Sequence, residues 1–158
     1  FADYVPVSSV KRLGLNELRA VILKYLPLGP AYFPEDYITD QPERFLAGEL
    51  IREKVLLSTR QEVPHSVAVT VDRWEETPKI TRIYATIHLE RDGQKAIVIG
   101  AGGAMLKLIG TQARHEMERL FDAKVYLDLH VHVQPGWRQN RAFLNALDWR
   151  TMTGEDDV

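Results

Sequence analysis

Four residues in the second half of the chain, Gly-Ala-Gly-Gly at 100–103, have the composition of a turn that accepts an anion. Glycine has no Cβ, so such a turn can adopt positive φ angles and lets a second backbone come within contact distance. A helix that begins directly after the turn presents free N–H groups and the positive end of its dipole. The residues from Ala104 onward have helical apolar spacing. The sequence therefore predicts a phosphate-accepting loop between two helices, here called the glycine loop.

Two nucleotide-binding motifs can be compared with the glycine loop. The phosphate loop of nucleoside triphosphatases, GxxxxGK followed by Ser or Thr, requires Gly-Lys where this chain has Met105 and Leu106. The dinucleotide fingerprint GxGxxG fits at its first two glycines, but its third glycine position is again Met105, whose bulk would obstruct close packing of helix and strand. Neither motif is complete. A nucleotide-dependent enzyme domain stays open only as an alternative.

Other reactive side chains form weaker patterns. The chain has no cysteine, which excludes disulfides, thiolate metal sites and a cysteine nucleophile. His130 and His132 share the polar face of one predicted strand, and His88 on another strand could join them. No third ligand is placed by spacing, so we expect no metal site. Glu35 and Asp36 lie in a proline-rich connector, where capping is a better interpretation than acid-base chemistry.

The composition of the 158 residues, 45% hydrophobic and 27% charged, is that of a soluble globular protein. Because 20 Lys and Arg stand against 22 Asp and Glu, a polyanion must be bound by a local basic patch and not by the net charge of −2. No apolar run approaches the roughly 18 residues of a membrane span, and the N-terminus lacks a signal-peptide pattern. We expect a cytoplasmic protein with one complete domain and part of another.

Hydrophobic periodicity predicts the elements that must position the glycine loop. Apolar spacing of three and four residues predicts a helix from an Asn16 cap to Leu26, and a longer one from a cap at Thr39 or Asp40 through Val55. Strict alternation predicts three strands, from Pro64 to 72, at 82–90 and at 125–133. A last amphipathic helix is expected from about Trp137 to Leu147, before an acidic tail.

Each predicted strand has one apolar and one polar face, so helices should cover the sheet on one side only. The fold class is therefore α+β, in the order helix, strand, strand, helix, glycine loop, helix, strand. A GxxG loop between two helices, beside a one-sided three-stranded sheet, is the arrangement of a KH domain, which clamps about four nucleotides of single-stranded nucleic acid. A protein-interaction module with this fold and no RNA ligand is the alternative.

Several segments also resemble one family, the Era GTPases, in which a type II KH domain follows a Ras-like GTPase domain. The matching segments are residues 33–40 (Phe-Pro-Glu-Asp-Tyr-Ile-Thr-Asp), 45–54 (Phe-Leu-Ala-Gly-Glu-Leu-Ile-Arg-Glu-Lys), 62–66 (Glu-Val-Pro-His-Ser) and 98–114. Residues 6–10 (Pro-Val-Ser-Ser-Val) are similar to the last guanine-contacting motif of the family, usually Ser-Ala; Ser8 matches its serine and Ser9 replaces its alanine.

The resemblance implies a domain organisation. Residues 1–27 would be the C-terminal remnant of a Ras-like GTPase domain, 28–40 an interdomain linker, 41–150 a type II KH RNA-binding domain with a C-terminal helix, and 151–158 an acidic tail. The phosphate loop, the switch regions and the Asn-Lys-x-Asp guanine motif are absent from this chain. We therefore expect no GTP hydrolysis and no cofactor for this chain, although GTP and Mg²⁺ belong to full-length members of the family.

The resemblance also implies a function. Members of the family bind a single-stranded stretch near the 3′ end of 16S rRNA during assembly of the small (30S) ribosomal subunit, and can associate peripherally with the inner membrane. This chain is then expected to be a monomeric RNA-binding part of such a protein. The implied RNA-binding residues are Val98, Ile99, Gly100, Ala101, Gly102, Gly103 and Ala104, with Arg91, Lys95, Lys107 and Arg114 as candidate phosphate partners. The family commonly has Lys at the position of Gly102, so this glycine loop lacks one charge.

Overall fold

The computed structural model describes residues 1–30, 32, 39, 41–59 and 66–148. Two compact units, Phe1–Thr39 and Asp40–Val158, make up the chain. Some of the sequence predictions lie outside the described residues. These are most of the connector at 28–40, the segment at 62–65 that includes Pro64, and the acidic tail at 151–158.

The described residues of the first unit form one helix, α1 (Leu15–Tyr25), which follows a turn closed by a bridge between Ser8 and Leu13. The helix is capped by Gly14 in the left-handed conformation (φ 71°), so the prediction of an Asn16 cap was wrong. Only glycine fits at position 14, because a Cβ there would lie 2.1 Å from the carbonyl oxygen of Pro6. No residue of α1 is buried.

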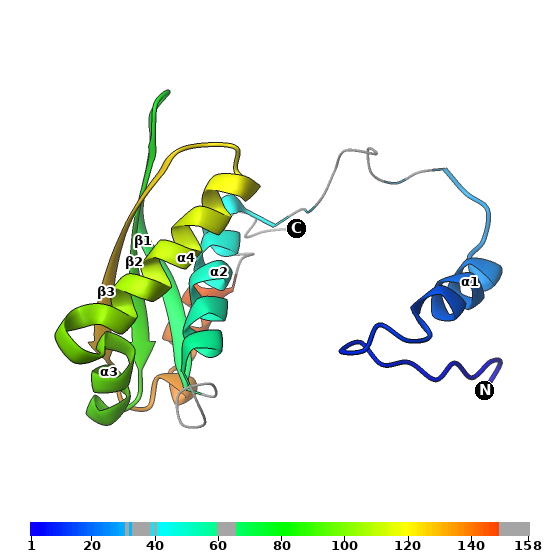
Figure 1. Cartoon of the computed structure of the whole chain (residues 1–158), viewed down its shortest axis with the longest axis horizontal. Helices are drawn as coiled ribbons and strands as arrows, with labels where there is room; N and C mark the ends of the chain where they lie inside the picture. The colour runs from blue at the N-terminus through cyan, green and yellow to red at the C-terminus, as the bar shows by residue number, and fades with distance from the viewer. Residues whose placement is uncertain (31, 33–38, 40, 60–65, 149–158) are drawn as a thin grey trace. The chain divides into compact units, whose positions relative to one another are not determined.

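The second unit has the predicted order of elements, shown in Figure 1. Its elements are α2 (Glu43–Ser58), β1 (Val67–Glu76), β2 (Thr81–Leu89), α3 (Asp92–Ile99), the 3₁₀ turn η1 (Ala101–Gly103), α4 (Ala104–Leu120), β3 (Val125–Val133), η2 (Trp137–Gln139) and α5 (Arg141–Leu147). This is the type II KH arrangement of the α+β class, as predicted.

The three strands form one mixed sheet in the order β1-β2-β3. β1 and β2 are antiparallel neighbours, with a register shift between Val71 and Arg73, whereas β2 and β3 run parallel. A parallel pair cannot be joined by a tight hairpin, so the chain crosses over through α3, the glycine loop and α4. Helices α2, α3 and α4 lie on one face of the sheet (Figure 1). The glycine loop is thus the sharp bend of the crossover.

The core lies between this helical layer and the apolar face of the sheet. Its largest fully buried side chains are Ile51, Ile83, Ile87, Leu89, Ile109, Met117, Val55 and Val98. They come from α2, β2, α3 and α4, at spacings that are multiples of four residues in α2 and α4 and of two residues in β2. Burying a branched or long aliphatic side chain contributes roughly 1.5–3 kcal/mol to stability. These buried side chains therefore hold the helical layer on the sheet.

Helix boundaries differ from the sequence predictions at two points. Helix α2 begins at Glu43 with Pro42 as its cap, and the carbonyl of Pro42 accepts the first helical hydrogen bond from Leu46, so neither Thr39 nor Asp40 caps it. The predicted C-terminal helix is broken at Asn140, whose backbone is extended and whose side chain caps α5 by accepting from the N–H of Phe143 (3.2 Å). In the second case a local cap overrides apolar periodicity.

The second face of the sheet is not fully open, because the segment after β3 reaches it. The ring of Phe143 on α5 lies 4.8 Å from that of His88 and 5.7 Å from that of Trp137, with each pair of rings edge to face. His88 and Trp137 are buried. The C-terminal segment therefore covers the part of this face around His88, which strand alternation by itself did not reveal.

No single helix among the described residues has the length and apolar composition to cross a membrane. Helices α3 and α4 meet that test only when taken together, and they are bent by 43° relative to each other. Their apolar side chains Val98, Ile109, Ala113 and Met117 are fully buried in the core described above.

Lys54 links α2 to α4 across the helical layer. Its ammonium group forms ion pairs with Glu53 on the same helix (2.9 Å) and with Glu116 on α4, and its side chain is 11% exposed. The hydrogen bond from Lys54 is the largest cause of the lowered pKa of Glu116. A carboxyl group with a lowered pKa stabilises the fold above its unfolded pKa and loses that contribution as the pH falls.

We expect Glu116→Gln to lower the free energy of unfolding by about 1 kcal/mol at pH 7, a modest value because Glu116 is about one-third exposed. The difference from the parent should begin to shrink as the pH falls below 4.5, the ordinary pKa of the group, and should be lost as the pH falls through the lowered pKa of Glu116 in the folded protein. Urea denaturation at several pH values measures both effects. Glu53→Gln is the matched control with a smaller effect, since Glu53 lies on the same helix as Lys54. A difference that does not change with pH would contradict the assignment.

The bend between α3 and α4 leaves no space for a side chain at its first residue. Gly100 has φ 70°, and a Cβ built there would lie 2.7 Å from the Cβ of Met105. Glycine therefore satisfies two requirements at this point, a left-handed backbone and close contact with α4. Gly93, near the start of α3, meets neither requirement, because no atom lies within 4 Å of the place that a Cβ would take and its φ is not in the left-handed range.

We expect Gly100→Ala to lower the free energy of unfolding by about 2–4 kcal/mol, since left-handed backbone strain and overpacking both contribute. Gly93→Ala should raise it by about 0.5–1 kcal/mol, because alanine reduces the entropy of the unfolded chain at a helical position. Urea denaturation of both variants against the parent gives the two values. Equal stability of the two variants would show that the contact with Met105 does not constrain the bend.

Candidate nucleic-acid interface

The glycine loop has the backbone geometry that its composition predicts. Gly100, Gly102 and Gly103 all have positive φ, at 70°, 57° and 81°. The N–H of Gly103 donates to the carbonyl of Gly100 (3.2 Å), which closes the turn η1 between α3 and α4. The prediction of positive φ angles between two helices is therefore confirmed.

The glycines of the loop have different surroundings. Gly100 faces Met105, as described above, but no atom lies within 4 Å of a Cβ built on Gly102 or Gly103. Ala101, Gly102 and Ala104 are exposed. The outer side of the loop is therefore backbone that another chain can approach without meeting side chains.

The start of α4, beside this backbone, has no side chain that caps it. Gly103 is the N-cap of α4, and no side chain makes a capping hydrogen bond there. The first turn also contains no acidic residue. The N–H groups of Gly103 and Ala104 donate within η1, to the carbonyls of Gly100 and Ala101, so an anion from outside the domain would meet the positive end of the helix dipole and the N–H groups that follow them.

A groove of about 370 Å³ runs from the glycine loop along α4 and beside β3. We call it the α4–β3 groove, and its lining residues are Gly103, Leu106, Lys107, Gly110, Thr111, Arg114, Leu127 and Leu129. At Gly110 α4 lies close to β3, because a Cβ there would lie 3.3 Å from the side chain of Leu129. The groove thus combines apolar residues with two cations and opens at the end of α4 that presents its N–H groups.

Two of the four predicted basic residues lie on α4, and the other two lie on α3 or directly before it. Lys107 and Arg114 line the α4–β3 groove, where Arg114 is paired with Glu118 (2.8 Å) and is therefore partly neutralised. Lys95 is half-buried on α3 and Arg91 is exposed directly before it, so neither belongs to the described lining of the groove. The structure brings two of the four candidates together.

The predicted apolar residues are not all accessible. Val98 is fully buried in the core, so its side chain supports α3 from beneath and cannot touch a ligand. Ile99 is half-buried and packs against the core, directly before Gly100. Leu127 and Leu129 of β3 were not among the predicted site residues, because their place beside α4 depends on the parallel pairing of β2 and β3.

Ser8 and Ser9 lie in the first unit, in the turn before α1. The hydroxyl of Ser8 accepts from the N–H of Lys11 (3.3 Å), and the carbonyl of Ser9 accepts from the N–H of Arg12 (3.3 Å). Arg12 has a positive φ of 52°. Both serines therefore form part of a tight local turn.

Sequence reasoning also missed Gln94, which lies at the beginning of α3. Its side chain is buried and binds the backbone of the turn before the helix and the hydroxyl of Ser66. The sequence contained only half of a capping-box signal, because Gln94 stands at the third helical position but the N-cap is Arg91 and not Ser or Thr. This residue positions the helix that leads into the glycine loop.

The histidines form a pair and not a metal-binding cluster within the part of the chain that the structure describes. The rings of His88 and His132 lie 6.0 Å apart on paired strand positions, and His130 is exposed two residues away. Burial lowers the pKa of His88, whose Nε2 lies 2.9 Å from the hydroxyl of Thr70. No group of three or more His, Cys, Asp or Glu that could hold a metal occurs among the described residues.

Known proteins with a similar sequence belong to one family. The family model of the KH domain matches residues 62–138. GTPase Era of Nostoc sp. is 57% identical over 136 residues, which are 86% of this chain and 42% of that protein. GTPase Era of Staphylococcus haemolyticus is 45% identical over 94% of this chain and 50% of its own length. The chain spans about half the length of the curated relatives it matches.

Solved structures agree with the sequence comparison. A crystal structure of a variant of Aquifex aeolicus Era bound to GDP·AlF₄⁻ matches with a TM-score of 0.86 and 41% identity, over 94% of this chain and 50% of that one. Era in complex with MgGDPNP and nucleotides 1506–1542 of 16S ribosomal RNA matches with a TM-score of 0.87, also at 41% identity and with the same coverage. The chain therefore belongs to the Era GTPase family and corresponds to the C-terminal part of its members, including their type II KH domain.

Proposed function

We propose that this chain binds single-stranded RNA near the 3′ end of 16S rRNA, with the glycine loop as its clamp. The observation that carries the proposal is the open backbone of Gly102 and Gly103 at the uncapped start of α4. A backbone phosphate can approach such a site to hydrogen-bonding distance of several N–H groups. The Era complex with 16S rRNA nucleotides supports this choice of ligand.

The α4–β3 groove extends the same surface in a direction that suits a nucleic-acid strand. Lys107 and Arg114 lie along α4 for successive phosphates, and Leu127 and Leu129 offer apolar surface to bases. Phosphate contacts position a strand, whereas contacts to bases select its sequence. Arg91, directly before α3, and Lys95, on α3, are proposed as additional phosphate partners. Ile99, Gly100, Ala101 and Ala104 complete the proposed contact surface.

For the whole protein, we propose the role that the family resemblance implies. Residues 1–27 would be the end of a Ras-like GTPase domain, with Ser8 and Ser9 as its guanine-motif remnant, and 28–40 would link it to the KH domain at 41–150, followed by the tail at 151–158. That protein would bind GTP with Mg²⁺, act in assembly of the small ribosomal subunit in the cytoplasm, and associate peripherally with the inner membrane. The unpacked apolar side chains of α1 support its assignment to a larger domain.

Equilibrium titration with a short fluorescent RNA from the 3′ end of 16S rRNA tests the function. We expect the parent to bind with a Kd on the order of micromolar in the absence of nucleotide, and binding should weaken as salt rises. Gly103→Asp should weaken binding by about tenfold, because its carboxylate occupies the place of a phosphate at the helix N-terminus. Gly103→Asn is the matched neutral control, since Asn and Asp both tolerate a left-handed backbone.

The outcomes separate the proposed function from its alternatives. Binding of nucleotide without RNA would favour an enzyme domain, and binding of neither would favour a protein-interaction module. If Gly103→Asp binds as tightly as Gly103→Asn, with both folded by circular dichroism, the glycine loop is not the clamp.

Gly102 allows the number of phosphate contacts at the loop to be changed. Gly102→Lys should bind RNA more tightly than Gly102→Gln at low salt and should steepen the slope of log K against log salt by about 0.7, the value for one phosphate of a single strand. The glutamine variant is the control for the left-handed backbone, whose strain of about 1–2 kcal/mol both variants share. Two salt titrations with one RNA give the slopes. Equal slopes would mean that no phosphate passes the loop at Gly102.

A further inference from the structure

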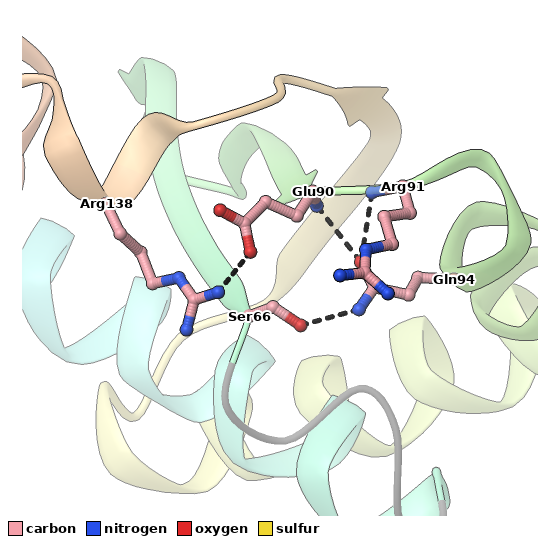
Figure 2. A network of polar contacts seen from close by, with 5 residues as sticks. All are labelled: Ser66, Glu90, Arg91, Gln94 and Arg138. Carbon is pink, nitrogen blue, oxygen red and sulfur yellow. Dashed lines mark hydrogen bonds and ion pairs between the residues drawn. The ribbon is translucent and has the colours of Figure 1, made fainter.

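Figure 2 shows a polar network that holds the first turn of α3. The side-chain oxygen of Gln94 accepts hydrogen bonds from the backbone N–H groups of Glu90 and Arg91, both at 3.1 Å. Its nitrogen donates to the hydroxyl of Ser66, at the start of β1, at 2.6 Å. Gln94 is 9% exposed and Ser66 is 5% exposed, so these bonds are made away from bulk water.

The network joins three segments that are distant in sequence. Ser66 precedes β1, Glu90 and Arg91 form the turn between β2 and α3, and the carboxylate of Glu90 forms an ion pair with Arg138 of η2 (Figure 2). Gln94 lies at the centre, since it bonds to the first two of these segments directly. A buried amide with three good bonds fixes both the position and the direction of the helix that carries it.

Helix α3 depends on this network because it has few other attachments. It contains eight residues, and its buried ones are Gln94 and Val98, one turn apart. Helices of this length are not stable by themselves, so their tertiary contacts decide where they lie. Val98 inserts into the core near the end of the helix, and Gln94 holds its beginning. Without Gln94, α3 would be held only near its end, by Val98 and Ile99, and could tilt about that point.

A tilt of α3 would reach the proposed RNA site directly. The helix ends at Ile99, and the next residue is Gly100. Gly100 packs so closely against Met105 that the bend has no space in which to absorb a shift of the helix. Lys95 also lies on α3, one residue after Gln94. Any displacement of the helix is therefore passed to the glycine loop and to one candidate phosphate partner.

We propose that Gln94 is a positioning residue for RNA binding: its bonds to Glu90, Arg91 and Ser66 hold α3 in the orientation in which the glycine loop accepts RNA. The inference rests on the proposed function. Gln94 does not touch the ligand. It acts by keeping the first turn of α3 ordered before RNA arrives, so that binding does not have to order it.

Substitutions at Gln94 separate positioning from general stability. Gln94→Met has a similar length but leaves two backbone donors without their acceptor. Gln94→Glu keeps the acceptor, which the N-terminus of the helix favours, and the Ser66 hydroxyl can turn to donate to it. Ser66→Ala removes one bond of three. The matched control is Thr77→Ala in the turn between β1 and β2, whose hydroxyl bonds to both backbone groups of Ile80 far from the loop in sequence.

The readouts are RNA affinity, with the same 16S 3′-end RNA, and hydrogen exchange of the α3 amides, at a temperature where all variants are folded. We expect Gln94→Met to bind about five- to tenfold more weakly, as loss of partners for buried donors implies, and to exchange faster at Glu90, Arg91 and α3. Gln94→Glu should bind within about twofold of the parent, Ser66→Ala should lie between, and Thr77→Ala should bind as the parent does.

Each outcome is decisive. Equal affinity of the parent and Gln94→Met would overturn the inference and leave the proposed function intact, as would a Gln94→Glu variant as weak as Gln94→Met. An equal loss in Thr77→Ala would show that affinity follows stability alone, which also overturns it. If Gln94→Met does not fold, Ser66→Ala against Thr77→Ala supplies the same comparison. A parent that binds no RNA would overturn the proposed function first, and the inference with it.

Discussion

The chain passes from α3 to α4 at a point where there is no room for a side chain, and the arrangement of the interface depends on this contact. Gly100 adopts φ 70° and lies against Met105, so the two helices meet at a sharp bend. Gly102 and Gly103, which follow in the same loop, have open space where a Cβ would be. The steric constraint at Gly100 therefore fixes the bend that carries this open backbone.

The electrostatics of the interface are local. The chain carries a net charge of −2, so no long-range field directs a polyanion to it. The local sources of positive potential are the start of α4 and two cations along the α4–β3 groove. The charge of Arg114 is offset by its ion pair with Glu118. Lys107 is the other cation of the groove, and within the described part of the chain no ion pair offsets its charge. Backbone dipoles thus provide much of the positive potential at the glycine loop.

Some polar side chains of the domain hold its elements in position. Lys54 ties α2 to α4 through Glu116, and Gln94 ties α3 to the start of β1 through Ser66. Buried polar groups need their partners, so each of them specifies one relative placement of two elements where apolar contacts would allow several. The apolar core provides cohesion, and these bonds define how the helical layer lies on the sheet.

The sequence by itself determined the features that depend on neighbouring residues. Alternation predicted the third strand with the bounds found for β3, Val125–Val133, and glycine composition predicted the positive φ angles of the loop. Both follow from local backbone preferences, which act within a few residues. The resemblance to the Era family, carried by short motifs, was confirmed by comparison with whole relatives.

Only the tertiary structure decided the features whose partners are far apart along the chain. Gln94 and Ser66 are 28 residues apart, and Arg138 and Glu90 are 48 apart, so no periodicity could pair them. The same reason explains why Leu127 and Leu129 were missed and why Val98, predicted to contact RNA, is buried instead. The pairing of β2 with β3 and the bend at Gly100 place α3 and α4 on the sheet. These contacts therefore decide which side chains are buried and which are exposed to solvent.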